Sequence, residues 1–204
     1  MTAPKAKTGL DVDHLRREIQ REYKMVAEQP EQGFHFHTGR KLASLTGYDD
    51  DLLAHVPDEV LRSFAGTGNP FAMGALKPGE KVVDLGCGAG IDSFIAAHQV
   101  GTGGEVIGLD MTQEMLNKAI AAKKKADLPQ LQFKQGFLEA LPVADGWADV
   151  VISNGVINLC PHKPKAFGEI FRVLKPGGRI QIGDILVSKP VSESAKQKID
   201  LWTG

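Results

Sequence analysis

Val82-Val83-Asp84-Leu85-Gly86-Cys87-Gly88-Ala89-Gly90 is an apolar run followed by three closely spaced glycines, a pattern typical of a buried strand that turns directly into a helix. Glycine suits such a turn because it adopts positive φ without strain and lacks the Cβ that would hold the backbone away from a ligand. The Gly-x-Gly-x-Gly spacing differs from the Gly-x-Gly-x-x-Gly of dinucleotide-binding enzymes. We therefore expect a small ligand at this turn, with contacts from Gly86, Cys87, Gly88 and Gly90.

Apolar runs of strand length alternate with helical patterns after residue 75. The expected strands are 81–85, 105–109, 131–135, 150–153 and 179–182. The expected helices are 91–99, 113–126 and 165–174. This alternation predicts a Rossmann-like, doubly wound α/β domain with a mostly parallel sheet over residues 75–204, whose last strands we expect to be missing beyond Gly204.

Residues 1–74 are predicted to form an N-terminal helical lid. Residues 11–28 carry apolar side chains at helical spacing among charges, and this helix should end before Pro30. Residues 49–64 are expected to be helical in pieces around Pro57. The stretch between these two segments is too irregular to assign, but we expect it to cover the cofactor and part of the acceptor pocket.

Composition and charge exclude several classes of function. The 204 residues include 42% hydrophobic residues, 24 basic and 25 acidic residues, so one sizeable core can form and no excess of positive charge attracts nucleic acid or a membrane surface. The start of the chain has no secretory signal, and no apolar run is long enough to span a membrane. We therefore expect a cytoplasmic protein without nucleic-acid or membrane partners.

Cysteine and histidine spacing gives no sign of a metal site. Cys87 and Cys160 are far apart and lack Cys-x-x-Cys spacing, which argues against a disulfide framework or structural zinc. His35 and His37 lie two residues apart, but no third ligand is evident. We therefore expect no bound metal.

Two acidic residues at strand ends indicate the kind of cofactor. Asp84 ends the first strand, where a carboxylate would repel the diphosphate of a nicotinamide cofactor but suits a cationic ligand. Asp110, followed by Met111, lies about 20 residues beyond the glycine turn, the separation expected for an acid that accepts hydrogen bonds from ribose hydroxyls. Together they favour S-adenosylmethionine over NAD, and alanine at Asp84 or Asp110 should abolish its binding.

Two further segments are expected at the same edge of the sheet. In the loop 136–139, Phe137, Leu138 and Glu139 are the candidates for adenine contacts, although Phe137 could equally belong to the core. Asn154 follows the fourth strand, at the edge where α/β sheets bind ligands, and could contact the methionine part or the acceptor.

The motifs resemble those of class I S-adenosylmethionine-dependent methyltransferases. The resemblance rests on residues 83–90, Asp110, Leu141-Pro142 and 172–178. More narrowly, the segments 68–70, 90–92, 108–116 and 151–159 are similar to arsenite methyltransferases. The resemblance implies the same fold, the same cofactor and transfer of a methyl group to a small-molecule acceptor.

The cysteines of the arsenite branch are not matched. That family holds trivalent arsenic through several thiolates, since a soft centre prefers sulfur ligands. Thr67 and Gly155 stand where the resemblance implies two of them, and a third would fall beyond Gly204. Arsenite is therefore not the expected acceptor.

No catalytic acid or base is expected, because the sulfonium is already activated and the protein mainly aligns the reactants. One alternative is an inactive or truncated module that binds S-adenosylmethionine without transferring its methyl group. A nicotinamide oxidoreductase is disfavoured by the glycine spacing and by Asp84. Apolar residues near Gly204 make a homodimer a further expectation.

Overall fold

The computed structural model describes residues 11–32, 34, 36–192, 195 and 202. These residues form a five-stranded sheet in the order β3-β2-β1-β4-β5, and every neighbouring pair is parallel. The strands are β1 (Lys81–Leu85), β2 (Glu105–Asp110), β3 (Leu131–Gln135), β4 (Ala148–Asn154) and β5 (Leu174–Gly183). The predicted Rossmann-like α/β fold is confirmed.

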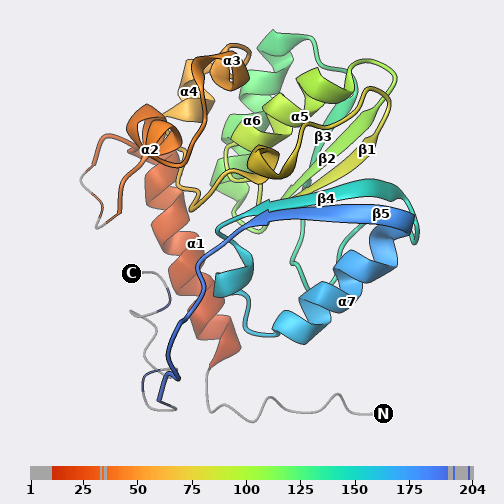
Figure 1. Ribbon diagram of the computed structural model, residues 1–204. Helices are drawn as coiled ribbons and strands as arrows, with labels where there is room; N and C mark the ends of the chain where they lie inside the picture. Colours follow the sequence, from red (N-terminus) through yellow and green to blue (C-terminus); the bar gives the residue numbers. More distant parts are fainter. Residues whose placement is uncertain (1–10, 33, 35, 193–194, 196–201, 203–204) are drawn as a thin grey trace.

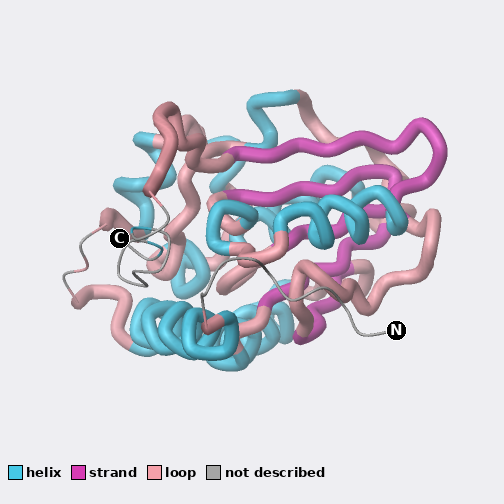
Figure 2. The backbone as a smooth tube through the Cα atoms, turned by 90° about the horizontal axis from the view of Figure 1, so that it is seen from below, coloured by secondary structure: helices cyan, strands magenta, loops and turns pink. Residues whose placement is uncertain are grey.

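Helices cover both faces of this sheet (Figures 1 and 2). On one face lie α5 (Ile91–Val100) and α6 (Gln113–Ala126), and on the other lies α7 (Lys163–Val173). The pleat of β1 serves both layers: Val82 packs in the core under α5, and Val83 packs in the core that includes Ile170 of α7. Side chains that alternate between faces explain why the strand is apolar throughout.

The N-terminal segment forms four helices and lies mainly at the carboxyl edge of the strands (Figure 1). They are α1 (Val12–Glu28), α2 (Gly39–Leu45), α3 (Asp50–Leu53) and α4 (Asp58–Leu61). Asp11 caps α1 by accepting a hydrogen bond from the backbone N–H of His14 at 2.9 Å. Leu15, Ile19, Val26 and Ala27 form the buried face of α1. Two short 3₁₀ helices, η1 (Pro70–Met73) and η2 (Ile157–Leu159), border the same edge.

Several predicted elements have their predicted bounds, namely the strands 81–85 and 131–135 and the helix 113–126. The pieces of helix around Pro57 are also present, with Pro57 at the N-cap of α4. Helix α2 was not predicted, because seven residues are too few to show a helical period. One continuous core joins Val26 and Phe64 to Val82 of the sheet, and the domain division at residue 75 stays a prediction.

The expectations about histidines, metal sites and membrane spans can be compared with the structure only for the described residues. His35 lies outside the described residues. Among the residues that are described, no cluster of three or more His, Cys, Asp or Glu side chains could hold a metal ion. No helix built from the described part of the chain is long and apolar enough to cross a membrane.

Candidate functional site

The glycine turn after β1 has the conformation that its sequence predicts. Gly86, Gly88 and Gly90 have φ of +64°, +54° and +100°. The backbone N–H of Cys87 donates to the carbonyl of Leu109 at 2.8 Å, which fixes the turn against the end of β2. A Cβ at Gly86 would lie 2.4 Å from both Cγ atoms of Val156, so only glycine fits there.

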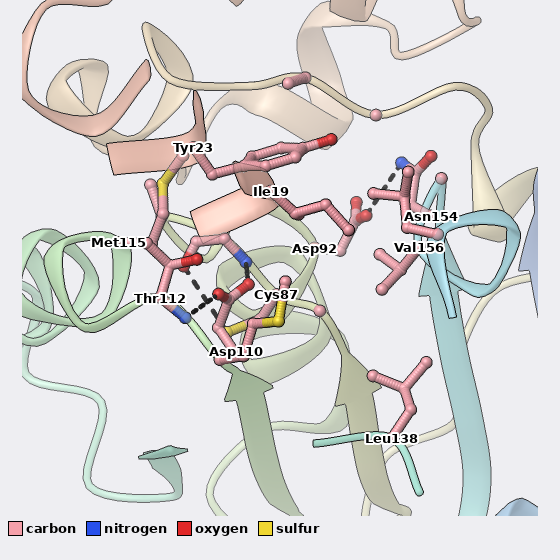
Figure 3. Close-up of a pocket in the computed structure, with 18 of the residues that line it drawn as sticks. Ile19, Tyr23, Cys87, Asp92, Asp110, Thr112, Met115, Leu138, Asn154 and Val156 are labelled. Atoms are coloured by element: carbon pink, nitrogen blue, oxygen red, sulfur yellow. Dashed lines mark hydrogen bonds between the residues drawn. The ribbon is translucent and has the colours of Figure 1, made fainter. Parts of the chain in front are cut away.

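A pocket opens beside this turn, at the carboxyl ends of β1, β2 and β4 (Figure 3). It has about 980 Å³ of empty space, including the part that is open to solvent. Nine residues expected from the sequence line it: Gly86, Cys87, Gly88, Asp110, Met111, Phe137, Leu138, Glu139 and Asn154.

Asp110 joins the end of β2 to the glycine turn. Its Oδ2 accepts a hydrogen bond from the N–H of Gly88 at 2.8 Å, and its Oδ1 accepts one from the N–H of Thr112 at 2.7 Å. Burial raises the pKa of this carboxyl, and the two backbone donors oppose that effect. A carboxylate has about four acceptor positions, so Asp110 can also accept hydroxyl donors from the pocket.

Helix α1 covers the side of the pocket formed by the loop 136–139. Arg16 forms an ion pair with Glu139 at 3.1 Å, and its guanidinium lies 4.5 Å from the ring centroid of Phe137. Gln20 donates to the carbonyl of Met111 at 2.9 Å. Phe137 is 39% exposed, so it belongs to the pocket wall and not to the buried core.

No direct signal in the sequence indicates that Arg16 lines the pocket. It lies 123 residues from Glu139 along the chain, and only the helical spacing of Arg16, Ile19 and Tyr23 places three lining residues on one face of α1.

Asn154 makes a full set of contacts with the protein. Its Oδ1 accepts from the N–H groups of Thr67 and Gly68, both at 2.9 Å. Its Nδ2 lies 2.9 Å from the hydroxyl of Tyr48, 2.9 Å from the carbonyl of Gly68 and 3.1 Å from Asp92 Oδ2. Asn154 therefore lines the pocket while fastening the segment 66–68 to the end of β4.

The geometry departs from the sequence expectation at Asp84 and Gly90, which are not among the lining residues. Asp84 is 2% exposed and accepts a hydrogen bond from the hydroxyl of Ser93 at 2.6 Å. Burial, and then the neighbouring Asp92, raise the pKa of Asp84 well above its usual value, which favours its neutral form. Gly90 is the N-cap of α5, and a Cβ there would lie 2.9 Å from the ring of Phe133.

Comparison with known proteins fits this arrangement. The family model described as "Methyltransferase domain" matches residues 76–203. The chain belongs to the S-adenosylmethionine-dependent methyltransferase family. Its cofactor is the one expected from the sequence, S-adenosylmethionine.

Several of the similar proteins are named for arsenic. The chain is 46% identical over 158 residues to the arsenite methyltransferase of Halobacterium salinarum, covering 78% of this chain and 40% of the relative. It is 35% identical over 162 residues to that of Aquipseudomonas alcaligenes, covering 76% of this chain and 46% of the relative. An arsenic(III) methyltransferase structure from Chlamydomonas reinhardtii has 38% identity and a TM-score of 0.68, covering 74% of this chain and 53% of that one. The chain thus spans about half the length of these relatives, or less.

The pocket of this chain suits the cofactor of its family. The glycine turn leaves room for the cofactor to approach the backbone at Gly88, where a Cβ would meet nothing nearer than Met115 Sδ at 4.0 Å. Asp110 would accept from the ribose hydroxyls, and Phe137 and Leu138 would face the adenine. These residue assignments remain proposals.

Replacing Asp84 with asparagine is expected to leave S-adenosylmethionine affinity within about threefold of wild type, because an amide resembles the neutral, buried carboxyl. Alanine at the same position should lower the free energy of unfolding by about 1–3 kcal/mol, because the Ser93 hydroxyl loses its acceptor. Calorimetry and urea unfolding would measure the two effects. A loss of binding in Asp84→Asn equal to that in Asp84→Ala would instead support an ionised Asp84.

Proposed function

We propose that the chain transfers the methyl group of S-adenosylmethionine to a small-molecule acceptor that enters beside the carboxyl end of β4. The observation that carries this proposal is the continuity of the pocket from Asp110 and the loop 136–139 to Gly66 and Gly155. Asp110 and the loop 136–139 suit the nucleoside of the cofactor. The end of the pocket at Gly66 and Gly155 has room for a second reactant. Relatives named for arsenite, a small acceptor, support this class of substrate.

The chain's own part in the reaction is alignment and exclusion of water. When bound, S-adenosylmethionine would supply an activated methyl group: the acceptor's lone pair would form the new bond to carbon as the carbon–sulfur bond breaks with its electron pair left on sulfur. Ile19 and Tyr23 of α1 cover the pocket between the glycine turn and the solvent. Burial raises the pKa of Tyr23, so its hydroxyl stays protonated near neutral pH.

The acceptor end lacks the ligands that would hold trivalent arsenic. Thr67 and Gly155, the two positions where the resemblance implies cysteines, face each other: a Cβ at Gly155 would lie 3.0 Å from Oγ1 and Cγ2 of Thr67. The pocket does contain the thiols of Cys87 and Cys160. Burial raises the pKa of Cys87 well above its usual value and that of Cys160 to about 12, so neither is a ready thiolate ligand. We therefore propose an acceptor other than arsenite.

The test begins with calorimetric titration of the purified chain by S-adenosylmethionine and S-adenosylhomocysteine, for which we expect micromolar binding. Methyl transfer from labelled cofactor would then be measured with thiol, hydroxyl and amine acceptors and with arsenite. A methylated product from an acceptor other than arsenite supports the proposal. Absence of cofactor binding, or arsenite methylation that stops when Cys87 and Cys160 become serine, would contradict it. Binding without transfer to any acceptor would favour the inactive module.

A further inference from the structure

The pocket carries more negative than positive charge. Among the described lining residues, the ones that are formally charged are Arg16, Asp92, Asp110 and Glu139. Arg16 and Glu139 form an ion pair, so they neutralise each other. The carboxylates of Asp92 and Asp110 have no basic partner among the lining residues, and such an environment favours a cationic ligand.

The two carboxylates lie at different ends of the pocket. Asp110 ends β2 and faces the side formed by Met111 and the loop 136–139. Asp92 lies in the first turn of α5, beside Asn154 of β4 (Figure 3). If Asp110 holds the ribose, the remainder of the cofactor extends toward Asp92.

The hydrogen-bond donors around Asp92 hold it in one position and oppose the effect of its burial by favouring the ionised form. The hydroxyl of Tyr48 donates to Oδ1 at 2.5 Å, and Asn154 donates to Oδ2 at 3.1 Å. The positive end of the α5 dipole also favours the ionised carboxylate of Asp92. Two donors leave acceptor positions on the carboxylate free for a ligand.

Asp92 and Asp84 form a pair of buried carboxyl groups with different roles. The groups that face Asp92 are Tyr48 from the α2–α3 connection, Asp84 from β1 and Asn154 from β4. Burial raises the pKa of Asp92 to about 6, while the hydrogen bonds from Tyr48 and Asn154 lower it. Asp84 has one hydroxyl donor, Ser93, and burial followed by the charge of Asp92 raises its pKa well above the usual value, so Asp84 is the member of the pair that more readily stays neutral.

We propose that Asp92 is the anionic contact of this pocket for a positively charged group at the methionine end of the cofactor. This inference rests on the proposed function, because it places S-adenosylmethionine in the pocket. The charged group is the ammonium or the sulfonium, and both would be recognised by the same carboxylate. Tyr48 and Asn154 are positioning residues that act through Asp92.

Three ligands separate these sources of charge in a calorimetric experiment. S-adenosylmethionine carries the ammonium and the sulfonium, S-adenosylhomocysteine carries the ammonium alone, and methylthioadenosine carries neither. Asp92→Asn should weaken S-adenosylmethionine binding by about tenfold or more, with methylthioadenosine affinity unchanged within about twofold. An equal loss for S-adenosylhomocysteine identifies the ammonium, and an unchanged affinity for it identifies the sulfonium. Asp51→Asn, on the exposed surface of α3, is the matched control.

The pH dependence gives a second readout that a purely structural role would not produce. Wild-type affinity for S-adenosylmethionine should fall as the pH drops through about 6, because Asp92 becomes protonated. Tyr48→Phe removes one donor to the ionised carboxylate and should move that midpoint to higher pH. The affinity for methylthioadenosine should not follow this transition.

The binding results distinguish a failure of the proposed function from a failure of the role proposed for Asp92. If the wild-type chain binds none of the three ligands, the proposed function itself is wrong. If it binds S-adenosylmethionine but Asp92→Asn weakens all three ligands equally, or none of them, the role of Asp92 is wrong and the proposed function stands. A thermal unfolding curve of Asp92→Asn like that of wild type would show that any loss of affinity is not a loss of folding.

Discussion

Alanine at Gly86 is expected to abolish measurable S-adenosylmethionine binding and to lower the free energy of unfolding by roughly 2–5 kcal/mol. The backbone there has φ of +64°, which an alanine adopts only with strain. The new Cβ would also lie 2.4 Å from both Cγ atoms of Val156, so either the loop that follows β4 or the glycine turn after β1 must move. Calorimetry would measure the binding, and urea unfolding would measure the stability.

Gly146 provides a matched control for this substitution. Its φ is +59°, and a Cβ at this position would meet nothing within 4 Å. Gly146→Ala should therefore cost only about 1–2 kcal/mol of backbone strain and leave cofactor binding intact. Val156→Ala in the Gly86→Ala background removes both clashing Cγ atoms and should restore part of the lost stability. Equal losses of stability in the two alanine variants would show that the contact with Val156 does not matter.

The fold could be predicted because its signals are local. Each buried parallel strand is a short apolar run, and each connecting helix is long enough to show its period. Helix α2 has seven residues, and α3 and α4 have four each. Whether such short segments are helical depends more on their packing in the folded protein than on their own sequence.

Site residues could be predicted from the sequence where they lie at the end of a single buried strand. The glycine turn and Asp110 both follow buried strands and both line the pocket. Arg16 and Asp92 were not identified as site residues, because their positions depend on contacts with segments that are distant in sequence. Arg16 meets Glu139 across 123 residues, and Asp92 meets Asn154 across 62.

Asp84 shows that a strand-end position alone does not bring a side chain to the pocket wall. Alternation along β1 places Asp84 on the same face as Val82, under α5, whose Ser93 donates to it. That periodicity was present in the sequence and indicates a carboxyl that points into the layer between sheet and helix. Direct contact of Asp84 with the cofactor stays a prediction based on the motif, whereas the direction of the side chain favours its contact with Ser93.

Alanine at Asp110 is expected to weaken S-adenosylmethionine binding by about a hundredfold or more, because two effects coincide. The cofactor would lose the acceptor for its ribose hydroxyls. The N–H groups of Gly88 and Thr112 would also lose the carboxylate that holds them at 2.8 and 2.7 Å, so the glycine turn would be less well ordered before binding. Titration calorimetry would measure the affinity.

Asparagine at Asp110 is expected to disturb both contacts, since its single carbonyl oxygen can satisfy only part of the backbone donors and its amide group repels the other N–H. We expect Asp110→Asn to bind S-adenosylmethionine more weakly than wild type and to unfold at a similar denaturant concentration to Asp110→Ala. Methylthioadenosine, which keeps the ribose and lacks the charged methionine end, should lose affinity in both variants, in contrast to its behaviour with Asp92→Asn. Unchanged methylthioadenosine affinity in Asp110→Ala would remove the ribose assignment and would place the nucleoside elsewhere in the pocket.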